Sequence, residues 1–328
     1  MDAQALQDPP AGRGEVLLKV LRAAAIGVGY MGRFHAQKLA ASMAAELVAV
    51  ADADAARARE IAKELGCAHE ADYGALLSRV DVACVAVPTD RHYEVVRACL
   101  ESGVHVLVEK PLAPSVAEAD ALLALARARG LVLQVGHLER FNPAFRALAA
   151  EPGRPLFIDI ERLAAFKARG TDVDVILDLM IHDLDLALAL ARAPVEQLSA
   201  CGFRVLTEAI DIANARIEFA DGCVASVSAS RVSQSQVRKL RVFHHDQYVS
   251  ADLQGQRLRY VRKGEGGIVE TERGFERVDA LAAQTEDFLR AVRERGAPAV
   301  SGEEGRRALD LALKVTGLVN ERLARHAP

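Results

Sequence analysis

The chain has 328 residues, of which 51% are hydrophobic and 26% charged, and its formal net charge is −4. This length suits two domains that each bury a core, and the composition is ordinary for a globular protein. The charge gives no reason to expect nucleic acid or an anionic membrane as a partner, and no stretch is long and apolar enough to span a bilayer.

Residues 1–20 are predicted to be a mobile extension. The stretch from Asp8 to Gly14 is rich in proline and glycine, which favours irregular structure. No apolar segment followed by a cleavage site marks it as a targeting signal.

The five cysteines are scattered and include no Cys-x-x-Cys pair. We therefore expect free thiols, a reducing cytoplasm and no zinc site of the usual spacing.

A glycine-rich turn lies between a short apolar segment, Leu21–Ile26, and an alanine-rich stretch, Arg33–Ala45, that has no helix breaker. The next apolar segment, Glu46–Asp52, ends in a carboxylate. This strand–helix–strand pattern is typical of dinucleotide binding, because glycines let backbone N–H groups approach a pyrophosphate and an acidic residue can bind a ribose diol. An ordinary turn of another α/β protein is the alternative. The residues expected at the turn are Gly27, Gly29, Tyr30, Met31 and Gly32.

The residue after Asp52 is Ala53, and neither an arginine nor a serine stands there to welcome a 2′-phosphate. This predicts NAD rather than NADP as the cofactor. Arg57 and Arg59 lie nearby and are the main argument against it.

Strands and helices continue to alternate up to residue 137. Further strands are predicted at Val80–Val87, Val104–Val108 and Leu131–Val135, and helices at Ala53–Leu65, Arg91–Ser102 and Val116–Arg129. The alternation predicts a doubly wound parallel sheet, a Rossmann domain at residues 21–137. Ligands of such sheets bind at the carboxyl ends of the strands, so the polar residues there should line one crevice. They are Asp52, Val87, Pro88, Thr89, Glu109, Lys110 and His137. For Glu109 and Lys110, a solvated charge pair is an equal alternative.

The pattern changes after Gly136. A strand is predicted at Leu156–Leu163, an amphipathic helix at Val173–Ala191, and successive strands from Gln197 to Arg262 with a hairpin turn at Asp221-Gly222. Short turns between strands favour a largely antiparallel open sheet, so residues 138–304 should form a second α/β domain. Two helices close the chain, near Asp279–Glu294 and Gly305–Ala324. The last, at 305–325, is expected to pack back on the first domain.

Asp178 and His182 are four residues apart in the predicted helix, so they share a face. An aspartate can fix the tautomer and orientation of a histidine, which suits a general base. Asp185, three residues after His182, could do the same. Two alternatives are a metal site on this helix and a buried histidine satisfied by its neighbour.

At these motifs the chain resembles the glucose–fructose oxidoreductase/inositol dehydrogenase (Gfo/Idh/MocA) family, from about residue 22 to the C-terminus. The matching segments are Gly27–Gly32, Val87–His92, Glu109–Pro111, Val135–His137 with Arg140 and Phe141, and Asp178–His182. The resemblance implies that Lys110 and His182 are the catalytic pair and that Asp178 supports them. It also implies that His92 and His137 lie at the cofactor, and that the open sheet of the second domain mediates dimers or tetramers. Thr89 replaces the usual asparagine and Met180 the usual glycine, which affects the nicotinamide contacts and the substrate pocket.

Within the family, Gly136–Pro143 and Asp174–Asp185 are most similar to nucleotide-sugar 3-dehydrogenases. This implies NAD-dependent oxidation at C3 of a UDP-linked N-acetylhexosamine, whose 3-keto product an aminotransferase could aminate for lipid A or related glycans. His182 would take the hydroxyl proton, and Lys110 would stabilise the oxygen as hydride leaves. Two phosphates in a negative protein need local basic groups. The expected substrate contacts are Lys110, Arg140, Asn142, Lys167, Arg169, Asp178 and His182. The alternatives are a free-sugar or cyclitol dehydrogenase and a non-enzymatic dinucleotide-binding regulator.

Overall fold

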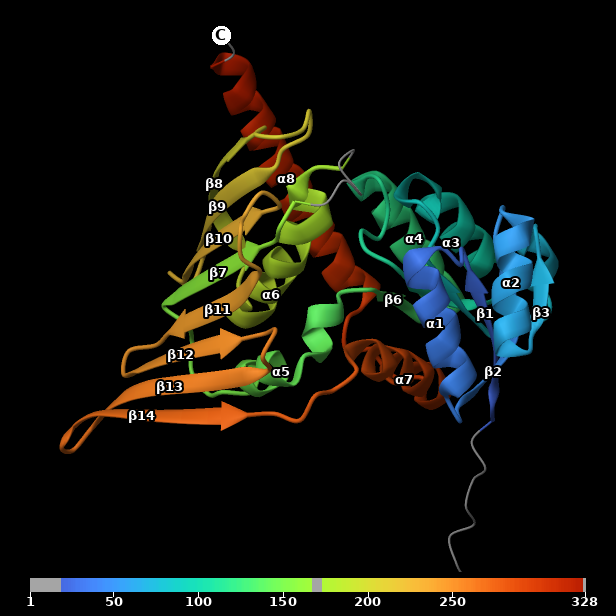
Figure 1. Cartoon of the computed structure of the whole chain (residues 1–328), viewed down its shortest axis with the longest axis horizontal. Coiled ribbons are helices and arrows are strands. Elements are labelled where there is room, and N and C mark those ends of the chain that lie inside the picture. The colour runs from blue at the N-terminus through green and yellow to red at the C-terminus, as the bar shows by residue number, and fades with distance from the viewer. Residues whose placement is uncertain (1–18, 167–172, 327–328) are drawn as a thin grey trace, which may run out of the picture.

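A computed structural model describes residues 19–166 and 173–326, which form two sheets with helices around and between them (Figure 1). Nearly all of the predicted extension at 1–20 lies outside the described residues, as do Lys167 and Arg169. Within the described ranges, no helix is both long and apolar enough to cross a membrane.

The first sheet has six parallel strands in the order β3-β2-β1-β4-β5-β6, which confirms the predicted doubly wound sheet. The strands are β1 (Leu21–Ile26), β2 (Ala45–Ala51), β3 (Ala68–Glu70), β4 (Val82–Val85), β5 (His105–Val108) and β6 (Leu133–Val135). Strand β3 was not predicted, because it is a three-residue edge strand, Ala-His-Glu, without an apolar run. The central strands β1 and β4 are almost wholly buried, since helices cover both faces of the sheet.

The helices of this half are α1 (Tyr30–Ala41), α2 (Ala55–Leu65), α3 (His92–Glu101) and α4 (Val116–Arg129), joined by α7 (Ala280–Glu294) from late in the chain. Their ends follow local sequence signals. Asp54 accepts hydrogen bonds from two N–H groups at the start of α2, and Gly66 ends that helix in the left-handed conformation. Ser115 caps α4, as its spacing from Glu118 suggests.

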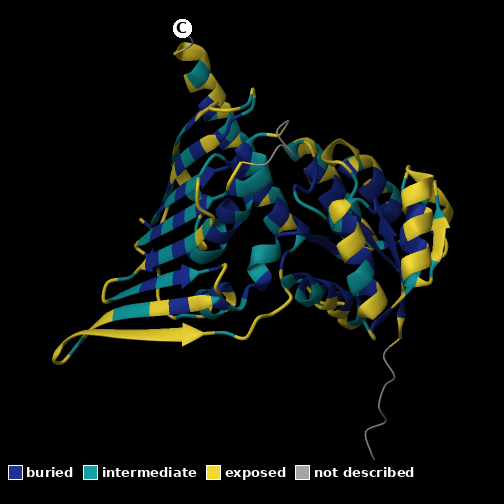
Figure 2. Ribbon diagram, in the orientation of Figure 1, coloured by how far each residue is buried: buried dark blue, intermediate teal, exposed yellow. Residues whose placement is uncertain are grey.

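The second sheet has eight strands in the order β14-β13-β12-β11-β7-β10-β9-β8. They are β7 (Phe157–Leu163), β8 (Val195–Phe203), β9 (Ile212–Phe219), β10 (Val224–Ser230), β11 (Val237–Phe243), β12 (Gln247–Asp252), β13 (Arg257–Gly264) and β14 (Gly267–Gly274). Only β7 and β10 pair in parallel, so the largely antiparallel prediction is confirmed. The predicted end of the strands at Arg262 is wrong, because β14 is exposed along its whole length (Figure 2) and shows no apolar alternation.

Three helices cover one face of this sheet: α5 (Pro143–Ala149), α6 (Ile181–Ala191) and α8 (Gly302–Arg325) (Figure 1). The predicted helix from Val173 differs at its start, where a π-turn at Ile176–Met180 precedes α6. Helix α8 begins three residues earlier than predicted, because Ser301 and Glu304 form a capping box.

Helix α8 contacts both sheets. A Cβ on Gly305 would lie 2.4 Å from the side chain of Val135 on β6, so the helix passes very close to the first sheet. Further along, Val319 packs within 2.9 Å of the position that a Cβ on Gly202 of β8 would take.

Candidate active site

Two glycines of the first turn have no room for a side chain. Gly27 has a φ of +81°, which favours glycine, and a Cβ there would lie 2.8 Å from the backbone of Ala86. A Cβ on Gly32 would lie 1.7 Å from the carbonyl oxygen of Gly27. These contacts hold the turn tightly against the end of β4.

Gly29 is different, because nothing lies within 4 Å of a Cβ built on it. It is the N-cap of α1, where no side chain caps the helix and the first turn has no acidic residue. Backbone N–H groups at this end of α1 are therefore available to an anionic ligand. The turn fits the pyrophosphate of a dinucleotide.

A cleft of about 920 Å³ opens beside this turn, at the carboxyl ends of the parallel strands. It brings together most of the residues predicted at the cofactor. They are Gly27, Gly29, Tyr30, Met31, Asp52, Val87, Pro88, Thr89, His92, Glu109 and Lys110. Gly32 and His137 do not line it: both are buried, Gly32 in the first turn of α1 and His137 after β6.

Asp52 braces the glycine turn. Its Oδ2 accepts a hydrogen bond from the N–H of Val28 at 2.8 Å, and its Oδ1 accepts one from the N–H of Asp54 at 2.9 Å. The guanidinium of Arg57 lies 3.6 Å from Oδ2. The ribose end of the cleft therefore contains a carboxylate with a partly exposed cation beside it.

His92 lies in the cleft wall and contacts the backbone of two loops. Its Nδ1 lies 2.7 Å from the carbonyl oxygen of Pro111, and its Nε2 lies 3.0 Å from that of Val87. Both ring nitrogens are thus used within the protein. We interpret His92 as a brace between two loops rather than a direct partner of the cofactor.

Lys110 reaches across from the first half of the chain to the start of α6. Its Nζ donates to the carbonyl oxygen of Asp178 at 2.6 Å and lies 3.5 Å from the carboxylate oxygen Oδ1 of the same residue. Asp178 lies in the π-turn, a distortion that is frequent at functional sites. The structure therefore brings two of the predicted catalytic residues together across 68 positions of sequence.

His182 is one turn further along and is held differently from what the sequence suggested. Its Nδ1 is buried and has no hydrogen-bond partner in the described part of the chain, so neither Asp178 nor Asp185 fixes its tautomer through that atom. The ring instead stands edge to face against His137, with centroids 5.8 Å apart. Burial, with the charges of Lys110 and Arg162, lowers the pKa of His182 well below its ordinary value. A neutral imidazole is thus ready to accept a proton.

A buried ionic network beneath His182 was missed in the sequence. Arg162, on β7, donates two hydrogen bonds of 2.7 Å to the carboxylate of Asp183 and a third, of 3.1 Å, to Glu139. Arg238 also bonds Glu139, at 3.2 Å. One signal was present: Arg162 follows Ile158 and Ile160 at alternating positions that face the core, so its charge had to find a buried partner.

Two predicted substrate contacts, Arg140 and Asn142, are occupied by protein partners. Arg140 lies 3.3 Å from the carboxylate of Asp185 through Nε, and its Nη2 bonds Glu304 on α8. Burial raises the pKa of Asp185 to about 7, although the charge of Arg140 opposes the rise. This arginine therefore balances buried carboxylates and does not face the cleft.

Asn142 caps α5, where its Oδ1 accepts from the N–H of Ala144 at 3.0 Å. Its Nδ2 donates to the carbonyl of Leu253 at 2.7 Å. The structure thus corrects the expectation for both residues, because charge balance and capping already occupy them. Among the described residues, no group of three or more histidine, cysteine or acidic side chains gathers as a metal site would require.

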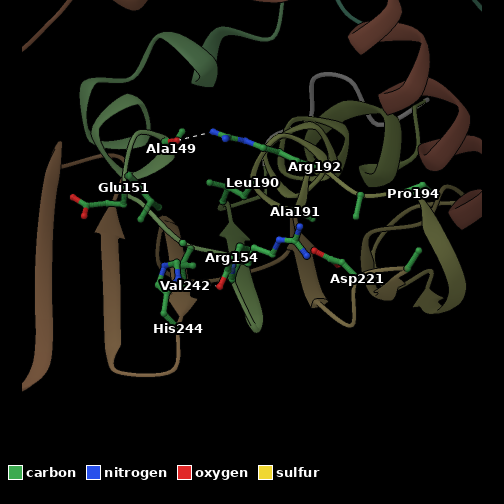
Figure 3. Close-up of a pocket in the computed structure, with 15 residues that line it drawn as sticks. Ala149, Glu151, Arg154, Leu190, Ala191, Arg192, Pro194, Asp221, Val242 and His244 are labelled. Carbon is green, nitrogen blue, oxygen red and sulfur yellow. Dashed lines mark hydrogen bonds between the residues drawn. The ribbon is translucent and has the colours of Figure 1, made fainter.

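A separate hollow of about 470 Å³ lies in the second half of the molecule, among the ends of α5 and α6 and the turn between β9 and β10 (Figure 3). Arg154, Arg192, Asp221 and His244 are among the side chains around it. It shares no residue with the cleft, and no predicted site residue lines it. The chemistry is therefore concentrated at the end of the first sheet.

A Rossmann sheet with an open glycine turn, a lysine in its cleft and a contact from that lysine to the segment that bears His182 together define a dinucleotide-dependent dehydrogenase. Residues 21–137 match the model of an oxidoreductase family with an NAD-binding Rossmann fold, and residues 153–250 match the GFO/IDH/MocA C-terminal domain. The chain belongs to the Gfo/Idh/MocA family of oxidoreductases, which confirms the resemblance seen in the sequence.

The relatives support this assignment over nearly the whole chain. UDP-N-acetylglucosamine 3-dehydrogenase of Acidithiobacillus ferrooxidans is 41% identical over 312 residues, covering 93% of this chain and 99% of the relative. A solved structure of that enzyme matches with a TM-score of 0.88 over 92% of this chain and 98% of that one. Myo-inositol 2-dehydrogenase of Thermotoga maritima is 28% identical, covering 88% of this chain and 93% of the relative.

Proposed function

We propose that this protein oxidises the C3 hydroxyl of UDP-N-acetylglucosamine to a ketone, with NAD as the hydride acceptor. The pairing of Lys110 with Asp178 carries the proposal, because it joins the end of the dinucleotide cleft to the segment that bears His182. The choice of sugar rests on the Acidithiobacillus enzyme, which is similar over almost its full length.

The roles of the residues follow from their surroundings. When bound, NAD supplies the nicotinamide ring that takes up a hydride. Neutral His182 accepts the hydroxyl proton through Nε2, since its Nδ1 is buried. The ammonium of Lys110 donates a hydrogen bond to the same oxygen and stabilises the charge that develops there. The carboxylate of Asp178, which is 44% exposed, holds Lys110 in place.

The residues around the cleft would hold the dinucleotide along its length. The turn at Gly27, Gly29, Tyr30 and Met31 would bind the pyrophosphate through backbone N–H groups. Asp52 would bind the adenosine ribose. The nicotinamide end would meet the strand ends at β4 and β5. Residues proposed there are Val87, Pro88, Thr89, Glu109 and Lys110, with Gly32, His92 and His137 supporting them from behind.

We propose NAD rather than NADP because the carboxylate of Asp52 would repel a 2′-phosphate. Arg57, 3.6 Å from that carboxylate, works in the opposite direction. Measuring kcat/KM with both cofactors tests the proposal. A preference for NADP would contradict it, and Arg57→Ala should then abolish that preference.

Lys167 and Arg169 are proposed to contact the two phosphates of the nucleotide sugar, as a protein of net negative charge requires local basic groups. Lys167→Ala and Arg169→Ala should raise KM for UDP-N-acetylglucosamine with a smaller effect on kcat. Lys314→Ala, on the exposed face of α8, is the control. The assignment fails if both variants bind the UDP-sugar like the parent, or if free N-acetylglucosamine is oxidised equally well.

A cyclitol or free-sugar dehydrogenase is the second candidate, because inositol dehydrogenases are similar over most of their length. NADH formation with UDP-N-acetylglucosamine, UDP-N-acetylgalactosamine, UDP-glucose, N-acetylglucosamine and myo-inositol separates the candidates. Turnover of myo-inositol above that of every UDP-sugar would replace the first proposal with the second.

We also propose that the protein is a homo-oligomer in which the outer face of the second sheet forms the interface. Phe203, Ile212 and Phe243 are exposed apolar side chains on β8, β9 and β11, and small residues such as Ser226 and Ser228 alternate with core residues along β10. Light scattering at micromolar concentration tests this, and a monomer would contradict it.

All five cysteines are free thiols, which supports the proposal of a reducing, cytoplasmic setting. The 3-keto product would suit an aminotransferase of lipid A or related glycan synthesis.

A further inference from the structure

A buried pair links the dinucleotide-binding helix to the residue before the catalytic lysine. His35 lies on α1, one turn after Gly32, and its Nε2 is 2.8 Å from Oε1 of Glu109 at the end of β5. The two side chains are 2% and 15% exposed. Nothing in the proposed mechanism uses either of them as an acid or a base.

The carboxylate of Glu109 also forms part of the cleft wall. It lines the cleft beside Lys110, and its Oε2 accepts a 3.3 Å hydrogen bond from the backbone N–H of Lys110. On the far side, a Cβ on Gly136 would lie 3.1 Å from Oε2, so the backbone packs against the carboxylate. His35 is thus its charged hydrogen-bond partner on the protein side.

The geometry favours an imidazolium paired with a carboxylate, because the 2.8 Å contact joins Nε2 of His35 to a carboxylate oxygen of Glu109. Burial disfavours the charged form of His35, but the neighbouring Cys84 and Glu109 outweigh it and raise the pKa of His35 to about 10. Burial likewise disfavours a charged Glu109, yet His35 and Lys110 keep the pKa of that carboxyl below its ordinary value. The two charges therefore cancel at neutral pH.

We propose that His35 cancels the charge that Glu109 presents to the nicotinamide end of the cofactor, and so sets the relative affinity of the enzyme for NAD⁺ and NADH. The inference rests on the proposed orientation of the dinucleotide, with its ribose at Asp52 and its nicotinamide at Lys110. The oxidised ring carries a positive charge that the reduced ring lacks. An unpaired carboxylate nearby would hold NAD⁺ selectively, whereas a neutral pair does not.

Dissociation constants for NAD⁺ and for NADH, measured by calorimetry without sugar, test the inference. His35→Gln leaves Glu109 charged beside Lys110, so Kd(NAD⁺)/Kd(NADH) should fall about three- to tenfold. Glu109→Gln removes the carboxylate, and buried His35 then gives up its proton, so the ratio should stay within about twofold of the parent's. The double variant should return the ratio to that of the parent.

His105→Gln is the matched control. His105 is also a partly buried histidine of the same sheet, but it lies at the opposite end of β5, where its Nδ1 accepts from the N–H of Val132 at 2.9 Å. The ratio Kd(NAD⁺)/Kd(NADH) of His105→Gln should equal that of the parent. His35→Asn makes the same charge change as His35→Gln and replaces it if thermal melting shows that His35→Gln does not fold.

Three outcomes would overturn the inference. An unchanged ratio in the folded His35 variant, or equal weakening of both cofactor forms, would show that the pair is only structural. A double variant with the same low ratio as His35→Gln would show that Glu109 is not the source of the effect. A parent protein that binds neither NAD⁺ nor NADH would overturn the proposed function and this inference with it, so the two failures are distinguishable.

Discussion

The two halves of the site use their polar groups in opposite ways. In the Rossmann half, ligand contacts come from the backbone at Gly27 and Gly29 and from side chains that line an open cleft. In the second half, several charged groups are buried and pair with one another, as Arg162 does with Asp183. Backbone N–H groups of the glycine turn remain available to a ligand, whereas a charged side chain that is buried in a core must pair with another group of the protein.

Lys110 and Arg140 show the contrast at the level of single residues. Both are basic and both lie beside an aspartate of the segment around α6. The partner of Lys110 is 44% exposed, but the partner of Arg140 is 3% exposed. Lys110 also lines the cleft, whereas Arg140 does not, so of these two residues Lys110 is the one placed where a substrate oxygen could approach.

The largest loss of activity should come from replacing the proposed catalytic pair. Lys110→Ala and His182→Ala should each lower kcat by at least about 100-fold, the usual cost of a lost acid–base group. NAD affinity should fall much less for His182→Ala, because we propose that His182 contacts the substrate rather than the cofactor. Steady-state kinetics and NAD titrations measure both, with Lys314→Ala and His105→Gln as controls. Near-full turnover by His182→Ala would remove histidine from the mechanism.

Breaking the buried network should cost stability. Arg162→Met leaves the carboxylate of Asp183 buried without its partner and should lower the free energy of unfolding by about 3–5 kcal/mol. Arg162→Met/Asp183→Leu should recover most of that loss, because no buried charge is then unpaired. Denaturant unfolding measures both. Arg290→Ala, which breaks exposed pairs on α7, is the control and should leave the melting temperature unchanged.

Substitution of two glycines in the same turn should have different effects, on packing at Gly32 and on ligand binding at Gly29. Gly32→Ala places a Cβ against the carbonyl of Gly27 and should destabilise the fold by about 1–3 kcal/mol. Gly29→Ala has open space, so stability should hold while Kd for NAD rises roughly fivefold as the methyl group enters the pyrophosphate site. Melting curves and NAD titrations of the pair would contradict this reading if Gly29→Ala bound NAD like the parent.

Acid stability should depend on the buried His137. Burial, with the charges of Lys110 and Arg140, lowers the pKa of His137 to about 3, whereas the unfolded chain binds that proton near pH 6.5. The folded state should therefore lose stability as pH falls from 6.5 toward 3, by up to about 1.4 kcal/mol per pH unit. Asp185, whose pKa is raised to about 7, acts in the opposite direction.

The difference between the parent and His137→Asn isolates this contribution from that of Asp185. Urea unfolding at pH 7 and pH 5 should show a shallower pH dependence for the variant. Equal slopes for the two proteins would mean that His137 titrates normally in the folded chain.

Short-range signals explain what could be predicted from the sequence. The strand–turn–helix pattern around Gly27 depends on neighbours a few positions away, and the sequence predicted it. Lys110 and His182 were recognised through family motifs. The contact that brings Lys110 to the segment bearing His182 joins Lys110 to Asp178 across 68 positions, which no local pattern describes.

The missed features depend on distant partners. Arg140 was expected at a phosphate because it follows the end of the strand at Val135, yet Glu304, 164 positions later, binds it. His35 lies in the predicted alanine-rich helix, where no local signal points to Glu109, 74 positions later, as its partner. The π-turn before α6 has no sequence signal that a 3.6-residue periodicity could detect.

Helix α8 has a mechanical consequence for how the enzyme admits its substrate. Its first turns lie against β6 of one sheet and its later turns against β8 of the other, so this one helix connects the two sheets. The two sheets cannot swing apart unless this 24-residue helix bends or slides over a close glycine contact at Gly305. Any change in the separation of the two sheets is therefore coupled to the conformation of α8 and to its packing at Gly305.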